Sequence, residues 1–163
     1  MKKLLLLFSL LVSFSYGFSQ HAVNVKKSAS AMLQADEQKD YDTYVSYFYP
    51  SELKRRGGKA TFIQQIQTNE RQAKPIGFSP GKQTLGKVSK IYKAGKELHC
   101  TIEWIRRTKG PEGTLVNRSH FLAISADQGT TWKFIMTGGK TPAEVRAMVP
   151  KFNEGLTWVD TYE

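Results

Sequence analysis

The sequence predicts an α+β domain in which about three N-terminal helices pack on a curved antiparallel sheet of about four strands. Apolar residues recur at helical spacing through the first half of the chain. In the second half they alternate with polar residues, as they do in half-buried strands. The connections between the expected strands are short, which favours an antiparallel meander.

The first 19 residues have the layout of a secretory signal peptide. Two lysines precede an almost wholly apolar run that ends at Phe14, and small residues then lead to an expected cleavage between Ser19 and Gln20. The apolar run is shorter than the roughly 20 residues that cross a bilayer. We therefore expect a periplasmic or secreted protein with one domain over residues 20–163 and no transmembrane anchor in the mature chain.

Three helices are expected in the first half of the mature chain, over residues 23–38, 41–49 and 59–73. The second starts after Asp40, whose carboxylate suits an N-cap, and Pro50 ends it because the residue before a proline disfavours helical backbone. The third follows the chain break at Gly57-Gly58 and ends before Pro75. Four residues of the second helix share one face: Tyr41, Tyr44, Val45 and Phe48.

Four strands are expected in the second half, over residues 83–92, 97–107, 114–126 and 131–137. A loop over 108–113, rich in turn-forming residues, separates the middle two. Thr141 and Glu144 then form the capping box of a short helix that Pro150 ends. The second strand alternates most clearly, with Leu98, Cys100, Ile102 and Trp104 on one face and His99, Thr101 and Glu103 on the other.

Charge and cysteine content narrow the classes of partner. The full chain has a net charge of +10, and removal of two lysines with the signal peptide leaves +8. The basic residues are spread along the chain without a nucleic-acid-binding motif, so we expect a solvated basic face and no nucleic-acid partner.

Cys100 is the only cysteine, so it cannot form an internal disulfide. It is expected to be a small buried hydrophobe, because free cysteine is among the most buried residue types. No motif for a metal or a cofactor accompanies it, and neither is expected.

A run of closely spaced aromatic residues precedes a double glycine, a helix and the meander strands: Asp40-Tyr41-x-x-Tyr44-Val45-x-x-Phe48-Tyr49-Pro50-x-Glu52-Leu53, then Gly57-Gly58-Lys59. This layout resembles the NTF2-like superfamily, also called cystatin-like or SnoaL-like. The resemblance implies a cone-shaped α+β fold with a pocket over nearly the whole mature chain. The superfamily includes isomerases, dehydratases, epoxide hydrolases and non-catalytic binding domains, so the resemblance does not select an activity.

A second, local resemblance lies at residues 125–132. The sequence Ser-Ala-Asp-Gln-Gly-Thr-Thr-Trp is similar to the Asp-box of sialidases, which recurs around a propeller. Here it occurs once, in a chain too short for a six-bladed propeller, so we interpret it as a structural hairpin turn. Asp127 is expected to accept backbone hydrogen bonds, Gly129 to take a positive φ and Trp132 to pack against the turn.

The candidates for acid–base chemistry are His99, Glu103 and His120. His99 and Glu103 share the polar face of one strand, and a histidine–carboxylate pair can transfer protons. The same residues could form a cross-strand surface pair, which is the favoured interpretation because the sequence gives no sign of a shielded environment. We therefore favour a non-catalytic protein without assigning any residue a catalytic role.

The candidates for ligand binding are Tyr44, Phe48, Trp104 and His120, which would line the cone. The alternative is that the aromatic residues fill the core. The leading hypothesis is a domain that binds a small apolar ligand or a protein partner. The alternatives are a cone-fold isomerase or hydrolase that uses the histidines with Glu103, and an assembly domain that forms a homodimer through its sheet.

Overall fold

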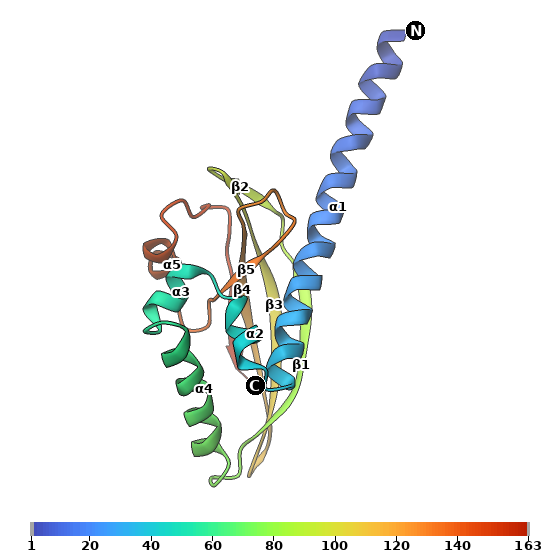
Figure 1. Ribbon diagram of the computed structural model, residues 1–163. Coiled ribbons are helices and arrows are strands. Elements are labelled where there is room, and N and C mark those ends of the chain that lie inside the picture. The colour runs from blue at the N-terminus through green and yellow to red at the C-terminus, as the bar shows by residue number, and fades with distance from the viewer. Residues whose placement is uncertain (1, 163) are drawn as a thin grey trace.

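The computed structural model describes the backbone of residues 2–162 and the side chains of residues 20–161, so the expected signal peptide lies outside the described side chains. Figure 1 shows helices packed against one curved sheet. The helices within this range are α1 (Lys2–Glu37), α2 (Tyr41–Ser46), α3 (Pro50–Arg55), α4 (Lys59–Ala73) and α5 (Pro142–Met148). The strands are β1 (Ser79–Val88), β2 (Tyr92–Ala94), β3 (Glu97–Gly110), β4 (Gly113–Ser125), β5 (Lys133–Met136) and β6 (Thr161–Tyr162).

The strands form one antiparallel sheet, which confirms the expected α+β class. The order along the sheet is β1-β3-β4-β5, with β2 also pairing with β3 and β6 with β4. β3 and β4 pair residue by residue, without a register shift, as far as Gly110 and Gly113. The loop expected over 108–113 is therefore only a two-residue turn, because strand pairing continues to the tip of this long hairpin.

Local signals placed two helices correctly and misplaced one boundary. The Asp40 carboxylate accepts a hydrogen bond from the Thr43 N–H at 3.1 Å, which confirms the expected N-cap of α2. α4 has the predicted bounds. However, α2 ends at Ser46, and Pro50 begins α3. Proline is favoured at the first position of a helix, where its missing N–H costs no intrahelical hydrogen bond.

The strand expected over 83–92 is divided into β1 and β2. β1 has two register irregularities against β3, so it bends away before β2 begins. Between the two strands, Ser89 keeps contact with β3 through both backbone and side chain. Its N–H donates to the Thr101 carbonyl at 2.8 Å, and its Oγ accepts from the Thr101 N–H at 2.9 Å.

The concave face of the sheet carries the larger core cluster. Helices α1, α2 and α4 contribute apolar residues that pack against β3, β4 and β5. Cys100 is fully buried there, as expected, and burial raises the pKa of its thiol to about 12. The largest buried members of this cluster are Met32, Phe48, Ile102, Phe121, Trp132 and Phe134.

The opposite face of the sheet is also covered, which the sequence did not predict. α5 and the segment after it pack on this face, where Val145, Val149, Phe152 and Leu156 join Leu122, Ile124 and Ile135. As a result, the presumed polar face of β3 is buried at its start: His99 is 0% and Thr101 3% exposed. Alternate side chains at the start of β3 therefore point into two different cores, one on each face of the sheet, and not into one core and solvent.

One edge of the sheet is closed by the segment between α2 and α3. The Tyr49 N–H donates to the Phe134 carbonyl at 2.9 Å, and the Phe134 N–H donates to the Tyr47 carbonyl at 2.9 Å. β1 lies at the opposite edge.

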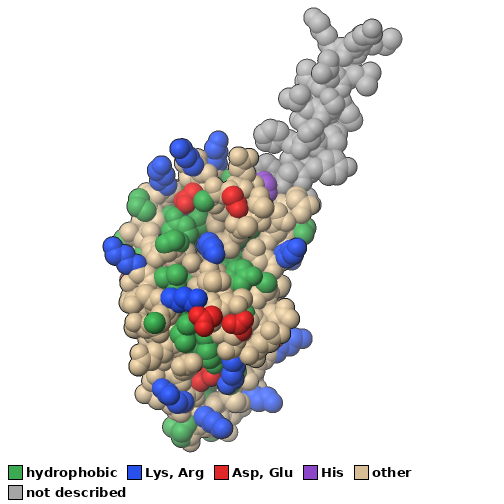
Figure 2. Space-filling view, viewed as in Figure 1, with side chains coloured by type: hydrophobic (Ala, Val, Ile, Leu, Met, Phe, Trp, Pro, Cys, Tyr) green, Lys and Arg blue, Asp and Glu red, His purple; other side chains and the backbone are tan. Residues whose placement is uncertain are grey.

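Among the described residues, no helix is both long and apolar enough to cross a membrane. Figure 2 shows basic and acidic side chains spread over one face of the molecule.

The turn before β5 is built as expected for the Asp-box-like sequence. The Asp127 carboxylate accepts hydrogen bonds from the Thr131 N–H at 2.9 Å and from the Ser125 Oγ at 2.7 Å. Gly129 has a φ of +85°, which a residue with a side chain rarely adopts. Trp132 is 1% exposed, and its Nε1 donates to the Gly129 carbonyl at 3.1 Å.

We predict that Asp127→Ala lowers the free energy of unfolding by roughly 1 kcal/mol, because it removes the acceptor that closes this turn. Asp127→Asn keeps one acceptor oxygen and should cost less. Urea unfolding of the three proteins at pH 7 measures the difference. If the alanine variant were as stable as the original chain, the hydrogen bonds of this carboxylate would not stabilise the turn.

Candidate binding site on the concave face

The aromatic residues proposed as a ligand-binding set lie on the concave face, packed against one another. Tyr44 meets Phe48 edge to face, with ring centroids 5.1 Å apart. Trp104 stacks on Phe121 with centroids 4.9 Å apart. Their exposed fractions are 5% for Tyr44, 1% for Phe48 and 9% for Trp104. These three side chains fill the core, and only Tyr44 and Trp104 lie next to polar groups.

His120, the fourth member of that set, lies on the other face of the sheet. Trp104 pairs with Ser119 in the register, so the next residue of β4 points the opposite way. There the Nδ1 of His120 lies 3.6 Å from the Oδ1 of Asp160. His120 is opposite Glu103 in the register, and Glu103 lies 3.9 Å from Arg118. The structure therefore separates His120 from the aromatic residues.

His99 has partners that the sequence analysis did not identify. Its Nε2 lies 3.2 Å from the Oε2 of Glu97, and the other oxygen of Glu97 accepts a hydrogen bond from the Tyr49 hydroxyl at 2.9 Å. Glu103 lies four residues farther along β3, a distance of about 13 Å in an extended strand. Glu103 and His120 thus lie opposite each other on one face of the hairpin, and His99 lies apart from both.

Burial determines the charge state of this second group. It lowers the pKa of His99, and the hydrogen bond to Glu97 opposes this shift only in part. The neutral imidazole therefore donates its Nε2–H to the carboxylate. Burial, together with the Glu97 carboxylate, raises the pKa of Tyr49. The result is one carboxylate held by two neutral donors.

The structure assembles a different polar site on the concave face. Gln83 of β1 pairs with Arg106 of β3, which in turn pairs with Asn117 of β4. These three polar residues lie side by side across three neighbouring strands, and we call them the polar row. In the adjacent register position, Trp104 is opposite Ser119. All five side chains leave the sheet on the same face because paired residues share a side.

Several buried polar atoms in and beside the polar row lack protein partners. Within the described residues, no hydrogen bond reaches Arg106 Nε, Asn117 Oδ1 or Ser119 Oγ, although all three atoms are buried. Ser119 as a residue is only 2% exposed. A buried polar atom without a hydrogen bond costs about 1–3 kcal/mol, so a further polar group that reached these three atoms would be stabilising.

One end of the polar row is fixed by one hydrogen bond to a helix and one from a neighbouring strand. Gln83 Nε2 donates to the Asp36 carboxylate of α1 at 2.7 Å, and the Trp104 indole donates to Gln83 Oε1 at 2.8 Å. Burial is the main reason that the pKa of Tyr44 is raised. The charges of Asp36, Arg106 and Arg56 also act on its hydroxyl. Tyr44 and Trp104 thus border the unpaired atoms with preset orientations.

A buried carboxylate organises basic side chains near this face. Glu52 is 0% exposed and accepts hydrogen bonds from Arg55 at 2.6 Å and from Arg56 at 3.1 Å. Burial alone would raise the pKa of Glu52, but these bonds and the charge of Lys140 outweigh it and hold the pKa low. Arg56 also contacts the Met136 sulfur at 3.7 Å. Three cations surround one anion, so this region retains positive charge.

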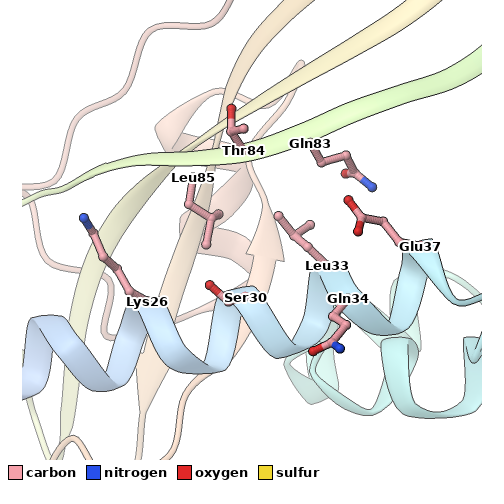
Figure 3. A pocket seen from close by; sticks show the side chains of 8 residues that line it. All are labelled: Lys26, Ser30, Leu33, Gln34, Glu37, Gln83, Thr84 and Leu85. Carbon is pink, nitrogen blue, oxygen red and sulfur yellow. The ribbon is translucent and has the colours of Figure 1, made fainter.

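A groove of about 440 Å³ between α1 and β1 begins at the Gln83 end of the polar row. Figure 3 shows Leu33 and Leu85 pointing toward each other across it, with Glu37 facing Gln83. A second hollow, of about 310 Å³, lies beside Tyr49 and Glu97. Among the described residues, no three histidine, cysteine or acidic side chains lie close enough to hold a metal ion.

Comparison with protein-family models, with curated proteins and with solved structures finds no match to this chain. The polar row cannot be recognised from the sequence because its members are far apart in the chain. Sequence analysis could have found the Glu52 cluster, because Arg55 and Arg56 follow Glu52 at i+3 and i+4, the spacing of helical ion pairs.

We predict that Glu52→Gln destabilises the protein by about 3 kcal/mol, because it leaves buried cations without their carboxylate. Arg55→Gln should lower the free energy of unfolding by less, because the Arg55 side chain is 42% exposed and water can reach the place it occupied. Thermal and urea unfolding at pH 7 compare the two variants. Equal losses would contradict a central role for the carboxylate.

We also predict that the stability of the protein falls as the pH drops below about 6.5, the ordinary value for histidine. The folded-state pKa of His99 is lower than this, so protonation favours the unfolded chain. The stability contributed by the neutral imidazole is present above pH 6.5 and is lost as the pH falls through the folded-state pKa. Urea unfolding gives the free energy of unfolding at pH 7.5 and at pH 5. The difference between these two values should be smaller in His99→Gln than in the original chain. An unchanged difference would rule out His99 as its source.

Proposed function

We propose that the protein is an exported, non-catalytic binding domain with an NTF2-like cone, and that its concave face binds a small organic anion with an apolar body. The observation that carries this proposal is the set of unpaired buried atoms at Arg106, Asn117 and Ser119. Export rests on the signal-peptide layout of residues 1–19. The cone rests on the order of helices and antiparallel strands.

The polar atoms define which ligand groups suit the site. An Arg106 Nε–H and a Ser119 hydroxyl supply donors, and Asn117 offers an amide that can donate or accept. Near the Tyr44 hydroxyl, Arg106 and Arg56 add positive charge beside the negative charge of Asp36, and Asp36 already accepts a hydrogen bond from Gln83. A carboxylate or another oxyanion would satisfy the arginine with a charge-assisted hydrogen bond, which is stronger than a neutral one.

The surroundings support an apolar body for the same ligand. Trp104 lies beside Ser119, and its indole is held in place by Gln83. Leu33 and Leu85 are the apolar residues of the groove that begins at Gln83, and its other lining residues are polar. A site with mostly apolar walls and a few placed polar groups is typical of small-molecule binding. The sequence alone favours a small apolar ligand or a protein partner. The polar row is the reason for adding an anionic group to the proposed small ligand.

The positions of the histidines favour binding over catalysis. His99 is buried with Glu97, and His120 lies on the other face beside Asp160. An acid–base enzyme needs its proton-transferring groups within hydrogen-bond reach of one substrate. Neither histidine belongs to the concave face that carries Arg106, Asn117 and Ser119.

We predict that Arg106→Gln weakens binding of a small aromatic or branched carboxylate by about 10- to 100-fold, the usual loss of a hydrogen bond to a charged group. Arg107→Gln is the matched control, because Arg107 follows on the same strand and points to the opposite face. A panel of organic carboxylates is screened by thermal shift, and hits are measured by calorimetry. The proposal fails if no carboxylate raises the melting temperature, or if both variants lose affinity equally.

A further inference from the structure

The end of the molecule at β2 carries basic side chains without acidic partners. Lys93 and Lys96 flank the tight turn between β2 and β3, and Lys90 precedes β2. All three are exposed, as is Lys151 from the segment after α5. Within the described residues, none of the four forms an ion pair. We call this set the lysine tip, and Figure 2 shows basic side chains gathered there.

The turn at Gly95 brings Lys151 into this set. Gly95 has a φ of +66°, and a Cβ there would lie 2.7 Å from the Lys151 Cδ and 3.3 Å from its Nζ. The Asn153 side chain donates to the Lys93 carbonyl at 3.1 Å and holds the segment against β2. Tertiary contacts therefore place the Lys151 side chain beside the turn that carries Lys96. Like charges held together without counterions favour binding of a polyanion.

The hollow below the lysine tip adds hydroxyl-binding groups. It is lined by Tyr49, Lys96, Glu97, Val149, Pro150 and Lys151. The Glu97 carboxylate is held by Tyr49 and His99 and retains acceptor capacity. A carboxylate next to two lysines repels a bare phosphate, but it accepts hydrogen bonds from the hydroxyl groups of a sugar. The same cleft thus suits a ligand that is both anionic and rich in hydroxyl groups.

A membrane surface fits this end of the molecule less well. Proteins that bind at the bilayer interface bury apolar side chains next to their basic ones. Among the described residues, the large exposed apolar side chains are Val23, Ile76, Leu115 and Val159, and none belongs to the β2–β3 hairpin or lines its hollow. The lysine tip therefore offers charge and hydrogen bonds without apolar anchors.

We propose that the lysine tip and the hollow below it form a second binding site, for an acidic polysaccharide. The lysines contact its charged groups, and Glu97 with Tyr49 contacts hydroxyl groups of one sugar ring. This site lies outside the concave face, so it is independent of the small organic anion proposed above.

The test measures binding of polygalacturonate, a carboxylated polysaccharide, to the full mature chain at several salt concentrations. We expect Lys93→Glu/Lys96→Glu to weaken binding by about tenfold or more and to reduce its salt dependence, because fewer counterions are released. The control is Lys74→Glu/Lys109→Glu, which makes the same change in charge at exposed positions outside the lysine tip. This control should change the affinity by less than about twofold, because salt screens charges that lie far from the bound polysaccharide. Circular dichroism and thermal unfolding check that both variants fold.

Three further probes distinguish the alternatives. Neutral dextran should not bind, and single-stranded DNA and phosphatidylglycerol vesicles should bind more weakly than polygalacturonate at equal charge. Equal losses in both double variants would show that only net charge matters and would overturn the proposal. Stronger binding to DNA or to vesicles than to polygalacturonate would also overturn it, since the site would then select for charge or for a lipid surface instead of sugar.

Discussion

The pairing of β3 with β4 is the constraint on which the rest of the structure depends. It runs without a slip along the whole of the hairpin, so it fixes the side of the sheet to which every residue points. A shift by one residue would move all of these side chains to the other face. Because each face is covered by its own apolar cluster, either cluster alone would oppose such a shift. This explains how Trp104 and Ser119 are held on one side, and Glu103 and His120 on the other.

Covering both faces changes the meaning of the polar residues in the hairpin. On the face under α5, His99 is kept neutral and gives its proton to a hydrogen bond with Glu97. On the concave face, Arg106, Asn117 and Ser119 have buried atoms that no protein group satisfies. The other face also carries buried atoms without hydrogen bonds, at His99 Nδ1, His120 Nδ1 and Asp160 Oδ1. The concave face differs in that its unpaired atoms include an arginine N–H, which can donate to an anion.

Positive charge is organised in two different ways in this molecule. Near the concave face, the buried carboxylate of Glu52 accepts hydrogen bonds from Arg55 and Arg56, so the positions of these two charges are fixed. At the lysine tip, the ammonium groups are exposed and have no acidic partners among the described residues. The first arrangement suits a small ligand that must be oriented. The second suits a long, flexible polyanion whose binding depends on salt.

Local chemistry in the sequence was sufficient for the features that involve few residues. The cap at Asp40, the bounds of α4, the turn at Asp127 and the burial of Cys100 follow from neighbours in the chain, and the structure confirms them. The second covered face, the partners of His99 and the polar row were decided only by tertiary structure. Each of them joins residues from separate elements, and a pattern of alternation shows that a strand has two faces without showing what covers each one. The sequence therefore determined the α+β class, and long-range packing determined which polar residues are brought together and buried.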